Sequence, residues 1–136
     1  MPSGLRDRIR RRLPLPWRRR LAVLSGGIVG GAGRIGLHNL GGSGPPWGTF
    51  VANVLGAFLL GYLLTRFLQA GSRSTLTIPL LGIGALGSFT TFSTFSVEVW
   101  DLLDRGEPVL AGSYAMASIA LGLVAAAVGM RWAERR

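Results

Sequence analysis

The chain has 136 residues, of which 49% are hydrophobic and 15% are charged, and its net charge is +9. Every basic residue except His38 is an arginine, and the sequence contains no cysteine. The lack of cysteine excludes disulfides and thiolate metal sites, and the apolar content leaves little chain for a soluble domain. Because the arginines flank apolar stretches, they fit anionic lipid headgroups better than nucleic acid.

The first 20 residues form a basic segment, with eight arginines between Arg6 and Arg20. A secretory signal also pairs a basic start with an apolar run, but that run is about 7–15 residues long and ends at small residues. The run here is about 20 residues long and lacks such a cleavage site. We therefore expect residues 1–20 to be a disordered arm and residues 21–136 to form one membrane unit.

Four apolar runs follow, at roughly Leu21–Leu40, Thr49–Leu68, Leu76–Leu103 and Val109–Trp132. A helix of about 20 residues crosses a hydrocarbon core about 30 Å thick, so each run is long enough, or nearly so, to span a membrane. The links between them are short, which predicts antiparallel neighbouring helices. The predicted fold class is an all-α membrane protein with four transmembrane helices.

The third run contains the most unusual stretch, Gly87–Ser96, in which serine and threonine are interleaved with three phenylalanines. Hydroxyl groups in lipid have no water to bond, so this cluster should face protein, an ion or an aqueous path. Glycine is a weak helix former and serine and threonine compete for backbone bonds, which favours a third helix broken near its middle. The alternative is an unbroken helix whose hydroxyls bond carbonyls four residues earlier, and composition does not choose between them.

Polar residues in the other runs allow more than one role. Asn53 is either part of an interhelical hydrogen bond or a donor that replaces water around an anion. Three roles suit Arg34, namely reaching the interface, bonding helix carbonyls and attracting anions, and we favour the structural ones. Glu98 lies about one turn beyond Phe95, either at the interface or at the end of a polar track. His38 lies alone near an interface, where we expect no metal role.

Three motifs lie in three of the runs. Residues 90–96 read TTFSTFS, residues 47–56 read WGTFVANVLG, and residues 30–34 read GGAGR. They resemble the TTFSTF, WGTLxVNxxG and GAxxR elements of the Fluc/CrcB fluoride channels, and their order and spacing match over nearly all of residues 21–136. The chain departs from that pattern at Ser88 and Phe89, where glycine and an aliphatic residue are common, and in its longer basic arm.

This resemblance implies a fluoride-selective passive channel in a bacterial cell membrane, which exports cytoplasmic fluoride and lowers its toxicity. The pathway residues that it implies are a donor amide, two phenylalanine ring edges, three hydroxyls and a carboxylate near the polar track. In that order they are Asn53, Phe92, Phe95, Thr94, Tyr114, Ser118 and Glu98.

The resemblance also implies an antiparallel dimer of dual topology, in which two subunits inserted in opposite orientations enclose two narrow fluoride pathways. A structural sodium ion would lie at the centre of this dimer. Its ligands would be backbone carbonyls at the break in the third helix, here those of Gly87 and Thr90, from both subunits.

The arginines predict an orientation. With four spans, both termini and the link at residues 69–75 share one side of the membrane, whereas Arg105 lies on the other side, with Arg34 leaning towards it. The positive-inside rule then places both termini in the cytoplasm. So strong a bias favours pairing with an oppositely biased paralogue over pairing with a second copy of this chain. The thirteen arginines on the terminal side are Arg6, Arg8, Arg10, Arg11, Arg12, Arg18, Arg19, Arg20, Arg66, Arg73, Arg131, Arg135 and Arg136.

Two other classes of membrane protein stay open at this point. A small four-span drug/proton antiporter needs a carboxylate embedded in the membrane, and Glu98 is a poor candidate, while the other acidic residues lie outside the spans or near their ends. A passive assembly subunit would explain the small residues in the helices but not the alternation of phenylalanine and hydroxyl groups. We expect no enzyme, because the sequence has no cysteine, one histidine and no paired carboxylates at membrane depth.

Overall fold

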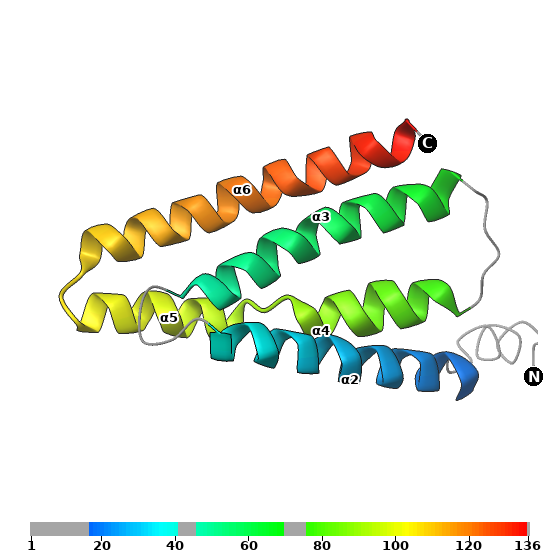
Figure 1. Ribbon diagram of the computed structural model, residues 1–136, viewed down its shortest axis with the longest axis horizontal. Helices are drawn as coiled ribbons and strands as arrows, with labels where there is room; N and C mark the ends of the chain where they lie inside the picture. Colours follow the sequence, from blue (N-terminus) through cyan, green and yellow to red (C-terminus); the bar gives the residue numbers. More distant parts are fainter. Residues whose placement is uncertain (1–16, 41–45, 70–75, 136) are drawn as a thin grey trace, which may run out of the picture.

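The computed structural model describes residues 17–40, 46–69 and 76–135, and within these ranges every regular element is a helix (Figure 1). The predicted disorder of residues 1–16 lies outside the described residues, whereas residues 17–20 belong to the first helix. The elements are α2 (Trp17–Leu40), α3 (Trp47–Gln69), the π-helix η1 (Ile78–Leu86), α4 (Gly87–Phe89), α5 (Ser93–Asp104) and α6 (Pro108–Glu134).

The turn between α5 and α6 shows how the sequence ends one helix and starts the next. Gly106 has a φ of 75°, the left-handed conformation that glycine adopts without strain. The N–H of Glu107 donates to the carbonyl of Leu102 at 2.9 Å, and that of Gly106 to the carbonyl of Leu103 at 3.0 Å. This pair of bonds closes α5 as a Schellman motif. Pro108 then opens α6, at a position where no backbone N–H is needed.

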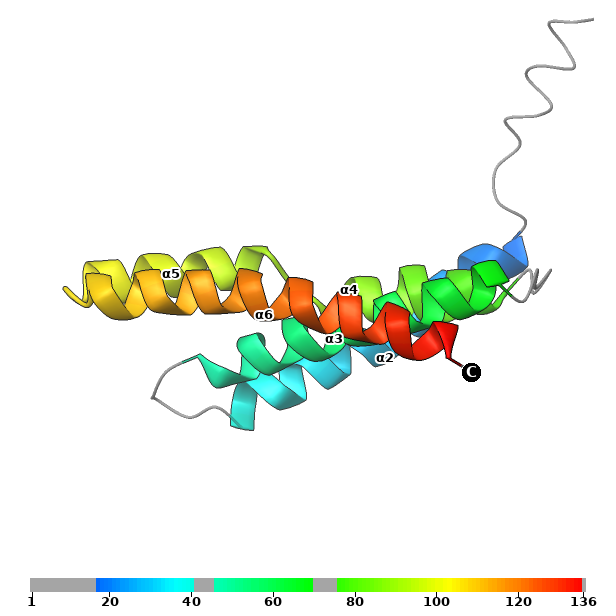
Figure 2. The same cartoon turned by 90° about the horizontal axis from the view of Figure 1, so that it is seen from above.

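Two pairs of elements pack closely, α3 along α6 and α2 along η1. Glycines allow these approaches: a Cβ at Gly129 would overlap the carbonyl of Phe58, and one at Gly30 would overlap that of Ala85. Small residues at helix contacts are the usual means by which membrane helices approach each other. At the end where α5 lies, Figure 2 shows α5 and the first half of α6 in one layer over the facing ends of α2 and α3.

Three helical stretches are long and apolar enough to cross a membrane, namely Trp47–Gln69, Ile78–Asp104 and Pro108–Glu134. The remaining predicted span, the first in the chain, corresponds to α2, which has 24 residues but is less apolar, because it contains many glycines together with Arg34 and His38. The all-helical fold is therefore confirmed, with three of the four predicted spans meeting both criteria.

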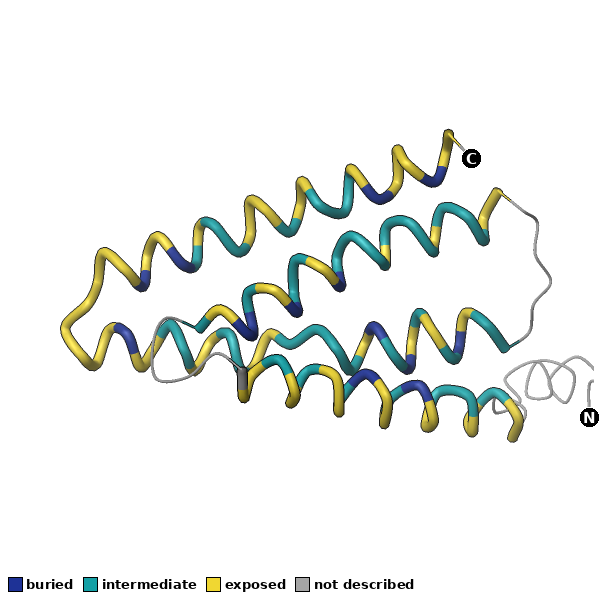
Figure 3. The backbone as a smooth tube through the Cα atoms, in the orientation of Figure 1, coloured by how far each residue is buried: buried dark blue, intermediate teal, exposed yellow. Residues whose placement is uncertain are grey.

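Many large apolar residues are exposed, and Figure 3 shows in yellow that exposed residues recur along α2, α3 and α6. Val109 is 85% exposed, and Val29 and Leu123 are each 69% exposed. Such faces suit lipid or a second subunit rather than water. The small buried core near α5 and α6 consists of Leu102, Ala111 and Tyr114.

Candidate functional site

The site is built around a short non-helical stretch between α4 and α5. Thr90 has extended backbone, with φ −78° and ψ 152°, and α5 begins only at Ser93. Asn53 of α3 bonds this stretch with both ends of its amide: Nδ2 donates to the Thr91 carbonyl at 2.9 Å, and Oδ1 accepts from the Thr91 N–H at 2.8 Å. A single side chain from another helix thus satisfies both backbone groups of Thr91.

These bonds release two carbonyls from the helical pattern. In a continuous helix the Thr91 N–H would donate to Gly87, and the Thr94 N–H would donate to Thr90. Instead the Thr91 N–H donates to Asn53, and the Thr94 N–H donates to the Thr91 hydroxyl at 3.2 Å. Gly87 itself stays helical, with φ −64° and ψ −27°. The extended residue is Thr90, whose hydroxyl donates to the Leu86 carbonyl at 3.0 Å.

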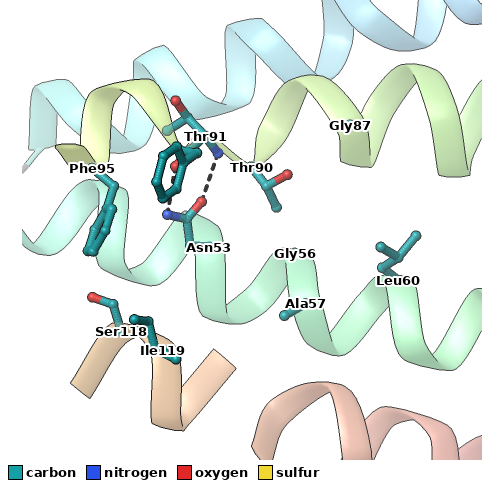
Figure 4. Close-up of a pocket in the computed structure, with 11 residues that line it drawn as sticks. Asn53, Gly56, Ala57, Leu60, Gly87, Thr90, Thr91, Phe95, Ser118 and Ile119 are labelled. Carbon is teal, nitrogen blue, oxygen red and sulfur yellow. Dashed lines mark hydrogen bonds between the residues drawn. The ribbon is translucent and has the colours of Figure 1, made fainter. Parts of the chain in front are cut away.

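An open cleft of about 530 Å³ lies beside this stretch, between α3, α6 and the α4–α5 region (Figure 4). The Phe92 side chain is 80% exposed, and its ring centroid lies 5.9 Å from that of Phe95. The Ser118 hydroxyl oxygen is buried and has no hydrogen-bond partner among the described residues. The cleft is lined by Asn53, Gly56, Ala57, Leu60, Gly87, Thr90, Thr91, Phe92, Phe95, Ser118 and Ile119.

A second polar cluster surrounds Glu98 and joins four helices. The hydroxyls of Thr49 and Tyr114 donate to the two carboxylate oxygens of Glu98, at 2.5 and 2.7 Å. His38 Nδ1 lies 3.7 Å from one of these oxygens. The Tyr114 ring also lies 5.4 Å from that of Phe95, between centroids, so the cluster adjoins the cleft through an aromatic contact.

Arg34 reaches the same region from α2. One of its terminal nitrogens lies 3.4 Å from the Thr94 hydroxyl oxygen, which also accepts a hydrogen bond from the Thr91 hydroxyl at 3.1 Å. The Arg34 Nε is buried without a hydrogen-bond partner among the described residues. Arg34 therefore contacts the hydroxyl run. Its bond to Thr94 is to a side-chain hydroxyl rather than to a helix carbonyl.

The cleft gathers most of the residues that the sequence singles out. Of the predicted pathway residues it contains Asn53, Phe92, Phe95 and Ser118, together with both predicted sodium ligands. The other three predicted pathway residues, Thr94, Tyr114 and Glu98, do not line it.

Three residues stand in the quoted motifs, but the sequence alone assigned them no role in the site. Thr91 carries both bonds to Asn53, Thr49 holds Glu98, and Gly56 leaves room for the methyl group of Thr90. A helical spacing would have pointed to Thr49 and Gly56, since Thr49 lies four residues before Asn53 and Gly56 lies three residues after it.

Comparison with known proteins places this chain among relatives of known name. Residues 21–130 match the model of the family described as CrcB-like protein, Camphor Resistance (CrcB). The chain is 44% identical over 112 residues to Fluoride-specific ion channel FluC 1 of Mycobacterium bovis, covering 80% of this chain and 85% of that protein. It is 44% identical over 115 residues to Fluoride-specific ion channel FluC of Oceanobacillus iheyensis, covering 83% and 89% of the two chains. It is 40% identical over 112 residues to the protein of the same name from Sphingopyxis alaskensis, covering 79% and 89%. This chain therefore belongs to the CrcB family.

Proposed function

We propose that this chain is a subunit of a fluoride-selective passive channel, which exports cytoplasmic fluoride and so lowers its toxicity. Relatives named fluoride-specific ion channels, at 40–44% identity over most of the chain, support this function. The observation that carries it is the cleft beside Thr90 and Thr91, because its lining offers the uncharged donors and ring edges that a small anion needs.

Fluoride is small and strongly hydrated, so a passage must replace its water with other donors. The Asn53 amide carries two N–H groups, of which one bonds Thr91 and the other is available to an anion. The Ser118 hydroxyl adds a second donor, and the edges of Phe92 and Phe95 carry the positive part of the ring quadrupole. None of the described residues that line the cleft is charged, so the ion meets weak sites in series that allow both entry and exit.

Beyond the cleft, we place the route past Phe95 towards Tyr114 and Glu98. The contact of 5.4 Å between the rings of Phe95 and Tyr114 supports this direction. Glu98 accepts hydrogen bonds on both oxygens, so its charge is partly balanced by donors rather than presented bare to the anion. Thr94 joins the route indirectly, because its hydroxyl accepts the hydrogen bond that orients Thr91.

The third span, in this proposal, is Ile78–Asp104, broken at the extended residue Thr90. The same break would hold a structural sodium ion. Sodium prefers oxygen ligands, and the carbonyls of Gly87 and Thr90 have both lost the helical donor four residues later. Gly87 is exposed in the single subunit, which suits a ligand shared with a partner at the dimer centre.

The assembly that we propose is an antiparallel dimer with both termini of this chain in the cytoplasm. The start of α2 and the ends of α3 and α6 lie at one end of the molecule (Figure 1). We call this the arginine-rich end. Among the described residues it carries six arginines against Glu134, and the positive-inside rule assigns it to the cytoplasm. An oppositely biased paralogue is therefore the favoured partner over a second copy. The six are Arg18, Arg19, Arg20, Arg66, Arg131 and Arg135.

The experiment is ion release from liposomes that contain the purified full chain, alone and together with a paralogue of opposite charge bias. We expect release of fluoride, retention of chloride and no exchange of protons for a cationic drug. Equal release of chloride, or drug efflux driven by a proton gradient, would assign the chain to another class of transporter. Single cysteines labelled from each side of the membrane report the orientation, and labelling from both sides with fluoride release by the lone chain would favour a homodimer.

A further inference from the structure

One stripe of α6 is exposed and changes from apolar to basic towards the C-terminal end. The stripe consists of Leu121, Val124, Val128 and Arg131 of α6 and of its C-cap residue Arg135. They follow each other at steps of three and four residues, and the C-cap keeps helical backbone, so they share one face. The three apolar members are 47%, 57% and 50% exposed in that order, and both arginines are exposed. The second half of α6 thus presents an apolar strip that ends in two positive charges.

The basic end of this stripe borders a groove of about 410 Å³, which is lined by Val128, Arg131, Trp132 and Arg135. The Trp132 ring packs against two aromatic side chains of α3, with centroid distances of 5.7 Å to Phe58 and 6.3 Å to Tyr62. One wall of the groove is therefore held in place by aromatic packing between helices. Tryptophan is also the residue that favours the level of lipid headgroups.

The groove lies at the arginine-rich end, where an anionic ligand meets further positive charge. A second groove at this end, of about 470 Å³, likewise joins a tryptophan and an arginine, Trp17 and Arg18, to apolar residues of α2 and η1. The opposite end differs in sign: Arg105 there is accompanied by Asp101, Asp104 and Glu107. The charge asymmetry thus singles out one membrane surface.

We propose that the groove at the end of α6 binds an anionic phospholipid of the phosphatidylglycerol type. Its phosphate would lie between the guanidinium groups of Arg131 and Arg135, which are neighbours on the helix and match phosphate geometry with paired N–H donors. One acyl chain would cover the apolar strip from Val128 to Leu121. The positive charges complement a phosphate, and the apolar strip lies directly beside them, as an acyl chain lies beside its headgroup. This arrangement argues for a lipid rather than for a soluble anion.

The test is native mass spectrometry of the purified full chain in detergent, titrated with phosphatidylglycerol or with phosphatidylcholine. The wild-type chain should retain phosphatidylglycerol in preference. The double substitution R131Q/R135Q should weaken that retention about thirtyfold, since each surface arginine contributes about fivefold to binding of an anionic lipid. R105Q is the matched control at the opposite end and should leave retention unchanged.

Three results would overturn the proposal. One is equal weakening by R105Q, which would reduce the effect to net charge. Another is displacement of the lipid by inorganic phosphate at matched concentration, which would make the site one for free anions. The third is unchanged lipid retention by R131Q/R135Q, accompanied by dissociation of the dimer in phosphatidylcholine vesicles or by a lower melting temperature. That outcome would assign the arginines to a subunit contact or to the helix C-terminus, where positive side chains are favourable in any case.

Discussion

Replacing Asn53 by aspartate separates the bonds to Thr91, which the structure shows, from the contact with fluoride, which we propose. In the unsubstituted protein, Asn53 donates to the Thr91 carbonyl at 2.9 Å and accepts from the Thr91 N–H at 2.8 Å. Aspartate keeps the size and the acceptor but faces the Thr91 carbonyl with a second oxygen. The lost bond costs about 1 kcal/mol, and the unfavourable pairing of two oxygens raises the total to roughly 1–3 kcal/mol of folding stability.

The effect on fluoride is larger than the effect on folding. A carboxylate about 4 Å from a passing anion raises its energy by about 4 kcal/mol at an effective dielectric constant of about 20. Since about 1.4 kcal/mol corresponds to a factor of ten, occupancy of that position falls roughly a thousandfold. We therefore expect Asn53→Asp to yield a folded protein whose fluoride flux is close to background.

The assay is fluoride efflux from liposomes, followed with a fluoride electrode, alongside a melting curve for each variant. Asn39→Asp is the matched control, because Asn39 is exposed at the end of α2 and should keep full flux. Asn53→Ser completes the series: its short side chain does not reach both groups of Thr91, so stability should fall, yet a donor remains and some flux should persist. Wild-type flux from Asn53→Asp would refute a close approach of fluoride to this residue.

Three further predictions concern the rings, the break and the Glu98 carboxylate. Phe92→Ile and Phe95→Ile should each fold normally but lower fluoride efflux by up to about tenfold, since the ring edge contributes at most about 1.5 kcal/mol; undiminished efflux from both would leave the rings as packing residues. Gly87→Val should keep the subunit folded, because an added Cβ meets only a carbonyl oxygen at 3.8 Å. It should lower the stability of the dimer in sodium, measured by size-exclusion chromatography. Thr90→Ser should have only a small effect on the stability of the dimer. Dimer stability that does not respond to sodium would count against the ion site. Tyr114→Phe removes a 2.7 Å bond to the part-buried carboxylate of Glu98 and should lower the free energy of unfolding by about 1–3 kcal/mol, and an unchanged melting temperature would show that the bond is replaced by another donor.

Local sequence patterns were enough to predict the helices and their ends to within a few residues. The second span, expected at Thr49–Leu68, is the helix Trp47–Gln69, and the fourth, expected at Val109–Trp132, is Pro108–Glu134. Both follow from the length of an apolar run between breakers. The first helix starts at Trp17 rather than Leu21, because arginine is a good helix former and does not end a helix.

Contacts between distant residues are what the sequence could not supply. The glycine at position 87 suggested where the helix would depart from regularity, but Gly87 is helical and the extended residue is Thr90. The backbone of Thr91 is bonded by Asn53, 38 residues away, so the cause is tertiary rather than a local propensity. Likewise the sequence alone did not pair His38 with Glu98, although they lie 3.7 Å apart in the folded chain.

The measurement that tests the fluoride pathway most directly is the reversal potential of the channel in a planar bilayer with fluoride and chloride gradients of opposite direction. A passive fluoride-selective pathway should give a reversal potential that follows the fluoride gradient by about 59 mV per tenfold change in concentration, whatever the chloride or proton gradient. A reversal potential that follows chloride, or that moves with pH at constant fluoride, would contradict the account.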